Sequence, residues 1–345
     1  MAVDVETSEH AAVNPGPIMG LVLGSWQAQM LLAAVEHNVF TELSKQAATS
    51  EELADRIGLV RLGTHDLLSG LSHLGLLEAE DGRFTNSAVA EQFLVSGRPE
   101  YLGGYLHFCR QELNPAWGGL ADSLRTGKPQ NQAAVAGNPY DSLYADAEAT
   151  DGFLDSMDLL NTPIAVAMSR FDWSEYTSFV DIGGARGNFA HQVVTHNPHL
   201  KGAVFDLPPL EPAFERHMER LGGTASPVAF HGGDFFKDEL PKADVLVFGH
   251  VLHNWGVEDR IRLLKRAYDA LEPGGSVFVY DPMAGGEQPA MHGALAGLTM
   301  LVWSRGGHEY TADDLHVWLR EAGFWPETVE VADLHDDVLV IGRKP

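Results

Sequence analysis

The feature that most constrains the fold is an alternation of apolar strands and amphipathic helices that begins after Trp173. Short apolar runs such as SFVDI and VLVFG alternate with helical segments such as VEDRIRLLKRAYDAL and ADDLHVWLREAGF. Strands that are buried on both faces read as continuous apolar runs, and the helices between them cover the sheet. Residues 171–345 are therefore predicted to form a Rossmann-like α/β domain with a doubly wound, mostly parallel sheet.

The N-terminal half has a helical pattern instead. Residues 18–40 read IMGLVLGSWQAQMLLAAVEHNVF and are apolar around most of a helix, so we expect burial in a core or against a partner chain. Further helices follow, then a hairpin with Asp81-Gly82 at its tip and another helix, which is the order of a winged helix. The recognition helix carries only Arg61 as a basic residue beside His65, so dimerisation is favoured over DNA binding. We expect residues 1–170 to form a mostly helical, winged-helix-like dimerisation and substrate-lid domain.

Length, charge and cysteine content limit the classes of partner and the cellular location that we expect. A chain of 345 residues fits two domains, and its net charge of −25 repels phosphate backbones, so no nucleic-acid partner is expected. No unbroken run of eighteen apolar residues is present and the first residues are acidic, so we expect neither a membrane span nor secretion. The single cysteine, Cys109, excludes an internal disulfide and suits the cytoplasm.

Glycines and acids follow successive strands of the predicted sheet. The first strand ends in Gly183-Gly184-Ala185-Arg186-Gly187, and glycines let a backbone pass close to a ligand. Asp206 ends the second strand, where an acid receives ribose hydroxyls, and Asp234-Phe235 ends the third, beside an adenine. Each alone also fits an ordinary turn, a helix cap or a core aromatic. Their register at neighbouring strand ends predicts an adenosine site.

The fourth strand ends in Phe248-Gly249-His250-Val251-Leu252-His253-Asn254-Trp255. An imidazole with an unperturbed pKa near ~6.5 suits removal of a phenol proton. A dinucleotide site would show G-x-G-x-x-G, whereas this turn reads GGARG, so a nicotinamide oxidoreductase is disfavoured.

These motifs together resemble the S-adenosylmethionine-dependent O-methyltransferases of the caffeic-acid type, including bacterial relatives that act on natural products. The motifs are, in order, VDIGGARG, FDLPP, GDFF, HVLHNW, LEPGG and GGHEYT, and the likeness covers nearly the whole chain. The resemblance implies S-adenosyl-L-methionine as cofactor, a small aromatic hydroxyl as acceptor, antibiotic-type biosynthesis, and a homodimer through the N-terminal domain.

The resemblance also implies the site residues. The general base falls on His253, and its supporting acids fall on Asp281 and Glu309. The cofactor contacts fall on Asp181, Gly183, Gly187, Asp206, Leu207, Gly233, Asp234, Phe235, Gly249, His250 and Trp255. The substrate pocket falls on Met157, Asn161, Met300, Trp303 and Ser304. No metal is expected, because no tight ligand spacing is present.

Some positions depart from the family pattern and some alternatives stay open. Asn254 replaces the usual Asp, which either caps the next helix or tunes the base, and Ala185-Arg186 replaces a smaller pair. Trp303 fits either a flat acceptor pocket or an interior contact. The alternatives in function are C- or N-methyl transfer, with or without a metal, and a non-catalytic cofactor-binding module.

Overall fold

The computed structural model describes residues 14–131, 134–135, 140, 143–144, 147–222, 228–285, 290–334 and 337–345. The chain divides into two compact units, 1–103 and 104–345, each of which is described by itself. The first unit contains α1 (Gly16–Glu36), α2 (Val39–Lys45), α3 (Ser50–Ile57), α4 (Arg61–His73), β1 (Leu77–Glu80), β2 (Arg83–Asn86) and α5 (Ala88–Phe93).

The first unit has the predicted order of three helices after α1, a hairpin and a further helix. Thr49 caps α3: its side chain accepts from the Glu52 backbone N–H at 3.2 Å, and the Glu52 carboxylate accepts from Thr49 N–H at 3.0 Å. This is a capping box, which satisfies two otherwise unpaired donors. β1 and β2 pair in antiparallel register across Asp81 and Gly82, both of which have positive φ. The winged-helix-like arrangement is therefore confirmed.

Helix α1 is apolar but exposed within the chain. Leu21 is 80% exposed and Trp26 is 60% exposed, and only Leu32 and Ala34 are buried. Burial of α1 in a core of its own unit is therefore wrong, which leaves the alternative of a partner surface. Among the described residues α1 is also the one helix long and apolar enough to cross a membrane. Length and composition thus do not exclude a span, although no unbroken apolar run is present.

The second unit is built around a sheet of seven strands in the described part of the chain. Their spatial order is β5 (Val228–Gly232), β4 (Lys201–Asp206), β3 (Ser178–Ile182), β6 (Val245–Gly249), β7 (Ser276–Asp281), β9 (Val338–Arg343) and β8 (Trp325–Val329). Neighbours from β5 to β7 are parallel, and β9 is antiparallel to both β7 and β8. The predicted doubly wound, mostly parallel sheet is confirmed.

The sequence pattern did not reveal β8. This strand lies at the sheet edge, is mostly exposed, and contains Pro326. An edge position tolerates a proline because one side of the strand needs no ladder hydrogen bond. Without an apolar run, no periodicity distinguishes such a strand from a loop.

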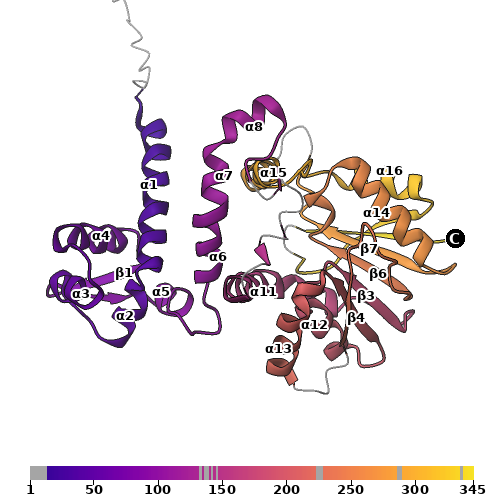
Figure 1. Ribbon diagram of the computed structural model, residues 1–345, viewed down its shortest axis with the longest axis horizontal. Coiled ribbons are helices and arrows are strands. Elements are labelled where there is room, and N and C mark those ends of the chain that lie inside the picture. Colours follow the sequence, from indigo (N-terminus) through magenta and orange to yellow (C-terminus); the bar gives the residue numbers. More distant parts are fainter. Residues whose placement is uncertain are drawn as a thin grey trace, which may run out of the picture. The chain divides into compact units, whose positions relative to one another are not determined.

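Helices cover both faces of the sheet (Figure 1). Residues of α11 (Ala147–Ser169), α12 (Asn188–His196) and α13 (Glu211–Gly222) pack on one face, and α14 (Val257–Ala270) and α16 (Ala312–Ala322) pack on the other. Other helical segments in the described part of this unit are α6 (Gly103–Phe108), η1 (Cys109–Leu113), α7 (Asn114–Gly118), α8 (Leu120–Thr126), η2 (Pro208–Leu210), η3 (Leu252–Asn254) and α15 (Met291–Trp303).

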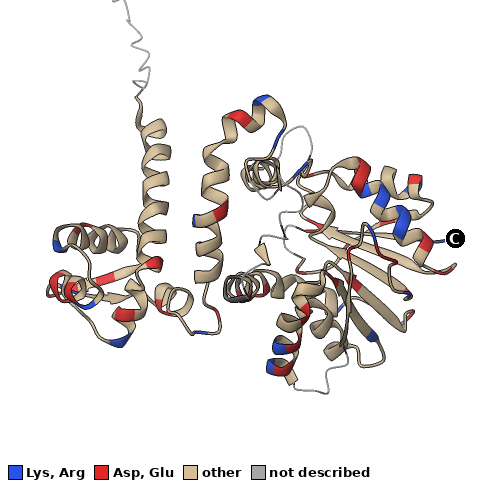
Figure 2. Ribbon diagram, viewed as in Figure 1, with Lys and Arg blue, Asp and Glu red and all other residues tan. Residues whose placement is uncertain are grey.

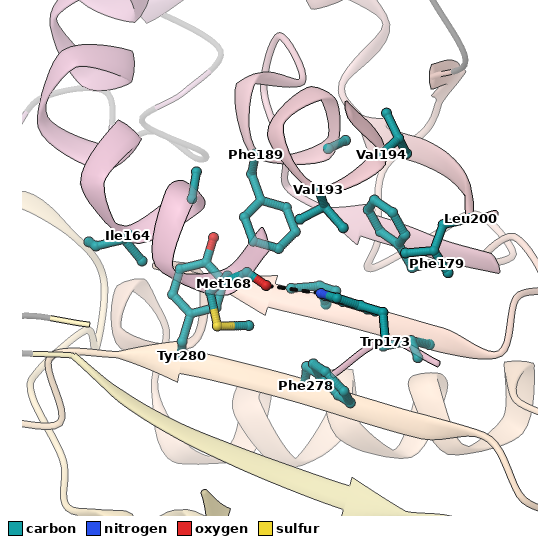
Figure 3. Packing of buried hydrophobic residues seen from close by; sticks show 14 of the residues in the cluster. Ile164, Met168, Trp173, Phe179, Phe189, Val193, Val194, Leu200, Phe278 and Tyr280 are labelled. Carbon is teal, nitrogen blue, oxygen red and sulfur yellow. Dashed lines mark hydrogen bonds between the residues drawn. The ribbon is translucent and has the colours of Figure 1, made fainter. Parts of the chain in front are cut away.

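One core contains the aromatic cluster of Figure 3. Trp173 stacks on Phe278 with ring centroids 5.2 Å apart, and its Nε1–H donates to the Met168 carbonyl at 2.9 Å. A buried indole is stable when its one donor is paired in this way. Met168 lies near the end of α11, which runs through Pro163 as one helix. Residues 104–170 thus belong to the second unit by packing, whereas the expected domain boundary at residue 170 marks where strand–helix alternation begins.

Candidate active site

The turn after β3 adopts a conformation that few side chains tolerate. Gly183 and Gly187 have φ of +78° and +83°, and Ala185 has φ of +49°. A Cβ on Gly183 would lie 2.9 Å from Val251 Cγ2. Ala185 is held in the left-handed region because its N–H donates to Asp206 Oδ2 at 2.8 Å. The turn therefore presents bare backbone at the carboxyl end of β3.

A pocket of about 570 Å³, open mouth included, lies at the ends of these strands. It brings together eight of the expected cofactor residues: Gly183, Asp206, Leu207, Gly233, Asp234, Phe235, His250 and Trp255. The sequence reasoning missed the other lining residues, Tyr140, Tyr144, Phe236, Val251 and Asn254. The rings of Tyr140 and Tyr144 stack on each other with centroids 5.8 Å apart, and no motif in the sequence around them identified them. We call this cavity the first pocket.

The two acids of the first pocket have pKa values shifted in opposite directions. Burial raises the pKa of Asp206 to about 6, against the opposing effect of two backbone N–H donors, from Leu207 and Ala185. Burial also acts to raise the pKa of Asp234, but the Lys237 ammonium, 2.7 Å away, leaves it lowered. Carboxylate oxygens have further lone pairs, so both side chains can accept hydrogen bonds from a ligand.

Aromatic rings form one wall of the first pocket. Phe235 and Phe236 meet edge to face with centroids 5.0 Å apart, and Trp255 lies 5.8 Å and 4.7 Å from them. Rings packed edge to face in this way restrain one another and together form an apolar wall. This wall suits a planar heterocycle beside the Asp234 carboxylate.

A second pocket of about 550 Å³ adjoins the first and shares Gly183 and His250 with it. Besides these two, four more expected residues line it: Met157, Asn161, Asp181 and Gly249. Burial, with the charge of Asp206 nearby, raises the pKa of Asp181 to about 8, so this acid is largely protonated at neutral pH. Gly187 lines neither pocket; a Cβ there would lie 2.9 Å from the Phe214 ring.

Three expected substrate residues lie elsewhere. Met300 and Trp303 belong to α15, and Ser304 follows it; none is among the lining residues of the two pockets. Trp303 is buried and packs edge to face on Phe108 with centroids 4.9 Å apart. The Ser304 hydroxyl donates to the Met300 carbonyl at 3.0 Å. Trp303 thus has the interior packing that the sequence left open, and the substrate roles of these residues stay predictions.

His253 of η3 forms a pair with Glu309 of the segment before α16; Glu309 is buried, His253 is partly buried, and neither lines either pocket. Nδ1 of His253 lies 3.1 Å from Glu309 Oε1, and the two side chains are 15% and 4% exposed. Burial alone would lower the pKa of His253, but the charge of Asp281 and the Glu309 contact raise it overall. The carboxylate therefore orients the ring through Nδ1 and stabilises its protonated form.

Asp281 makes its hydrogen bond to Tyr310 and not to His253. Its Oδ2 accepts from the Tyr310 hydroxyl at 2.5 Å, and the structure gives it no hydrogen bond to His253. Burial raises its pKa against the lowering effect of the His253 charge. Of the two expected supporting acids, Glu309 is the one that contacts the imidazole, because Asp281 points to Tyr310.

Arg260 was missed by the sequence reasoning, although it holds the His253–Glu309 pair in place. This fully buried side chain donates to the Leu252 carbonyl at 2.9 Å, to the His253 carbonyl at 3.4 Å, and to the His308 carbonyl. Its guanidinium also lies over the Tyr310 ring, 4.5 Å from the centroid. The sequence did contain a signal for this residue, because Arg260 shares the buried face of helix α14 with Leu263, Leu264 and Ala267.

Asn254 is not a helix cap. α14 begins after Gly256, which makes no side-chain cap, whereas Asn254 Nδ2 donates to the His250 carbonyl at 2.9 Å. An ionised Asp has no donor for this bond, so the capping interpretation is wrong. His250 itself has φ of +54°, and its Nε2 lies 2.7 Å from Asp337 Oδ2. This His–Asp contact restrains a residue that lines both pockets.

The structure provides no metal-binding cluster in its described part. No group of three His, Cys, Asp or Glu side chains there is close enough to hold an ion. The site therefore offers a pocket with an aromatic wall and acceptor oxygens, a neighbouring pocket that contains carboxyl groups, and an oriented imidazole.

Comparisons with known proteins agree with this geometry. An O-methyltransferase domain family matches residues 117–325, and an O-methyltransferase dimerisation domain family matches residues 19–96. The tetracenomycin polyketide synthesis 8-O-methyl transferase TcmO of Streptomyces glaucescens is 41% identical over 337 residues, 96% of this chain and 97% of TcmO. The N,N-dimethyltransferase OxyT of Streptomyces rimosus is 39% identical over 333 residues, 95% of this chain and 96% of OxyT.

Among solved structures, human N-acetylserotonin methyltransferase in complex with SAM matches with a TM-score of 0.84 and 25% identity. The match covers 97% of this chain and 99% of that one. The chain is therefore a methyltransferase and belongs to the O-methyltransferase family that carries an N-terminal dimerisation domain.

Proposed function

We propose that this enzyme methylates an aromatic hydroxyl of a small molecule in natural-product biosynthesis, with S-adenosyl-L-methionine as methyl donor and His253 as general base. The observation that carries the proposal is the His253–Glu309 pair. The His253 ring lies 5.9 Å, centroid to centroid, from the ring of His250, which lines both pockets. An imidazole held by a carboxylate beside a ligand pocket is the arrangement that proton removal needs.

The two pockets fit the two ends of the cofactor. In the first pocket, Asp206 can accept ribose hydroxyls, and Asp234 with the Phe235–Trp255 wall can hold an adenine. In the second pocket, Asp181 can accept a hydrogen bond from an ammonium group, whose positive charge would favour the carboxylate form of this acid. The bare backbone of Gly183, which lines both pockets, admits a chain between them. When bound, S-adenosylmethionine supplies an electrophilic methyl group on a sulfonium centre.

The protein then has two tasks, to orient the acceptor and to remove one proton. Nδ1 of His253 is held by Glu309, so Nε2 is the atom that takes the acceptor proton. The imidazolium that forms is stabilised by the Glu309 carboxylate, and Arg260 keeps the two segments together. A base of this kind contributes ~10²–10⁴ in rate.

The decisive test uses labelled S-adenosylmethionine and a panel of phenols and naphthols. His253→Ala is expected to lower transfer by ~10²-fold or more, while His196→Ala, an exposed histidine at the far end of α12, keeps the wild-type rate. Undiminished transfer by His253→Ala would refute the base assignment. Calorimetry with S-adenosylhomocysteine separates loss of chemistry from loss of binding.

N-methylation is the second candidate, because OxyT, a relative at 39% identity, is an N,N-dimethyltransferase. An amine acceptor presents the same geometric problem, since its nitrogen also attacks the methyl carbon and loses a proton. Including aromatic amines in the panel, with NMR assignment of the labelled methyl group, distinguishes the two. A product methylated only on nitrogen would overturn the O-methyl proposal.

The partner of the N-terminal unit is proposed to be a second copy of the chain in the cytoplasm. The proposal rests on the exposed apolar surface of α1 and on the dimerisation family that covers residues 19–96. Leu21 and Trp26 are mostly exposed and would be covered in a dimer. Light scattering at micromolar concentration is expected to give twice the chain mass, and Leu21→Glu is expected to reduce it; a monomeric wild type would contradict the dimer.

A further inference from the structure

An arginine is buried inside the glycine-rich turn of the cofactor site. The Arg186 side chain is 2% exposed and lies between Ala185 and Gly187. Its Nε donates to Asp158 Oδ2 at 2.6 Å, and a terminal nitrogen donates to Asp155 Oδ1 at 2.6 Å. A guanidinium can address two carboxylates in fixed directions, which an ammonium cannot. The turn is thereby tied to two carboxylates that lie one turn apart on α11.

The same stretch of α11 forms a wall of the second pocket. Leu154, Met157, Asp158 and Asn161 line it at helical spacing, and the turn residues Gly183, Gly184 and Ala185 lie across from them. Arg186 therefore connects the two walls of one pocket. The width of that pocket depends on where α11 is held relative to the turn.

Other contacts surround this link without replacing it. Asn188 Nδ2 donates to Thr162 Oγ1 at 3.0 Å, and Arg220 of α13 donates to Asp155 at 3.3 Å. His217 lies 3.4 Å from Asp158 Oδ2, but burial and the nearby Arg186 and Arg220 lower its pKa to about 3, so it stays neutral. Figure 2 shows acidic and basic residues interspersed along α13. Arg186 is thus the buried cation that joins α11 to the turn directly.

Stability alone explains this arrangement poorly. A buried ion pair loses much of its Coulomb energy to desolvation, and apolar replacements are often equally stable. What the pair does supply is a defined distance between two elements.

We propose that Arg186 is a positioning residue that holds α11 at one distance from the cofactor turn and so keeps the second pocket formed before a ligand arrives. The inference rests on the proposed function, since the ligand of this pocket is taken to be the amino-acid end of the cofactor. Without the link, α11 samples other positions. The apparent dissociation constant then rises in proportion to the lost fraction of binding-competent molecules.

The test compares full-length wild type with Arg186→Gln and Arg186→Lys, using S-adenosylhomocysteine as the probe in calorimetry. Arg186→Gln is expected to raise the dissociation constant and the KM for S-adenosylmethionine about tenfold, as when a tenth of the molecules remain competent. At saturating cofactor kcat is expected to stay near wild type, because the His253–Glu309 pair makes no contact with Arg186 in the structure. The dissociation constant of Arg186→Lys is expected to lie between those of wild type and Arg186→Gln.

Arg216→Gln is the matched control. Arg216 also joins α13 to α11, through Asp151 at 2.8 Å, but both side chains are well exposed and neither lines the second pocket. This variant is expected to bind S-adenosylhomocysteine like wild type. Should Arg186→Gln fail to fold, Asp155→Asn removes one of the two contacts at a residue that is 46% exposed, and it is expected to weaken binding in the same direction.

The outcomes are distinct. A lowered Tm with an unchanged dissociation constant would make Arg186 merely structural and overturn the inference, as would a loss confined to kcat. Wild type that binds no S-adenosylhomocysteine would instead overturn the proposed function itself. Weaker binding by Arg186→Gln with Arg216→Gln unchanged supports the inference.

Discussion

Buried acids at the carboxyl ends of the parallel strands have raised pKa values, whereas an acid at the amino ends has a lowered one. At the carboxyl ends, Asp181, Asp206 and Asp281 are each less than 10% exposed, and burial raises the pKa of all three. At the amino ends, Asp244 before β6 accepts from Thr177 N–H at 2.7 Å, from the Thr177 hydroxyl at 2.6 Å and from Ser178 N–H at 3.1 Å. Its pKa is lowered, although partial burial acts to raise it.

The difference separates function from stability within one sheet. An acid with a raised pKa is held in a site that disfavours its charge, so in its ionised form it destabilises the empty fold. An acid with a lowered pKa is stabilised as a carboxylate by the donors around it and strengthens the fold. Asp181, Asp206 and Asp281 thus keep raised pKa values where a ligand is expected to bind, whereas Asp244 at the opposite edge is stabilised as a carboxylate; Asp234, paired with Lys237, is the exception at the carboxyl edge.

The largest expected effect breaks the catalytic pair at the carboxyl edge. Glu309→Gln removes the charge that orients His253, and we expect kcat to fall by ~10²-fold with cofactor affinity nearly unchanged. Because Glu309 helps to raise the pKa of His253, the acid limb of the pH–rate profile should also move to lower pH. In wild type the base is free only above its raised pKa, so the rate should rise with pH. A profile that does not move would contradict the pairing.

An intermediate effect concerns the destabilising acids. Asp181 has a folded pKa of about 8, well above its ordinary value, so the folded state holds this proton more tightly than the unfolded state. At low pH the side chain is protonated in both states and its burial costs little. As pH rises from about 4 to 8, the unfolded state loses this proton and the folded state keeps it, so the free energy of unfolding of the empty enzyme should decline. Asp181→Asn mimics the protonated form and is expected to be more stable than wild type at pH 8 by a few kcal/mol, on the order that linkage allows.

Denaturant unfolding at pH 5 and pH 8 measures this effect. The advantage of Asp181→Asn should be smaller at the lower pH, where wild type is protonated as well. An advantage that is equal at both values would contradict the assignment of the pKa to Asp181.

The smallest expected effect concerns Asp244, at the amino ends of the parallel strands. Asp244→Ala removes an acceptor of three hydrogen bonds, and we expect a loss of about 1–3 kcal/mol in the free energy of unfolding. Because the pKa is lowered in the fold, this stabilisation is present above the unfolded value and is lost as pH falls through the folded one. Cofactor affinity should not change. The exposed pair between Lys242 and Glu272 offers a control, since Lys242→Ala should leave Tm unchanged.

Much of the site was predictable because it lies along the backbone. The strands ending in Gly183, Asp206 and Asp234 are parallel neighbours, so their ends must meet once the sheet is recognised. His253 follows β6 in the same way. The first pocket accordingly contains most of the cofactor residues expected from the sequence.

What the sequence alone determined was thus the sheet, the winged-helix-like order of the first unit, and the acids and glycines at the strand ends. Strand alternation and turn residues are local, and parallel topology converts them into neighbours in space. Only the tertiary structure decided that Glu309 rather than Asp281 contacts His253, that Arg260 clamps their segments, and that Arg186 reaches α11. Such contacts depend on side-chain directions between elements far apart in sequence, which no periodicity records.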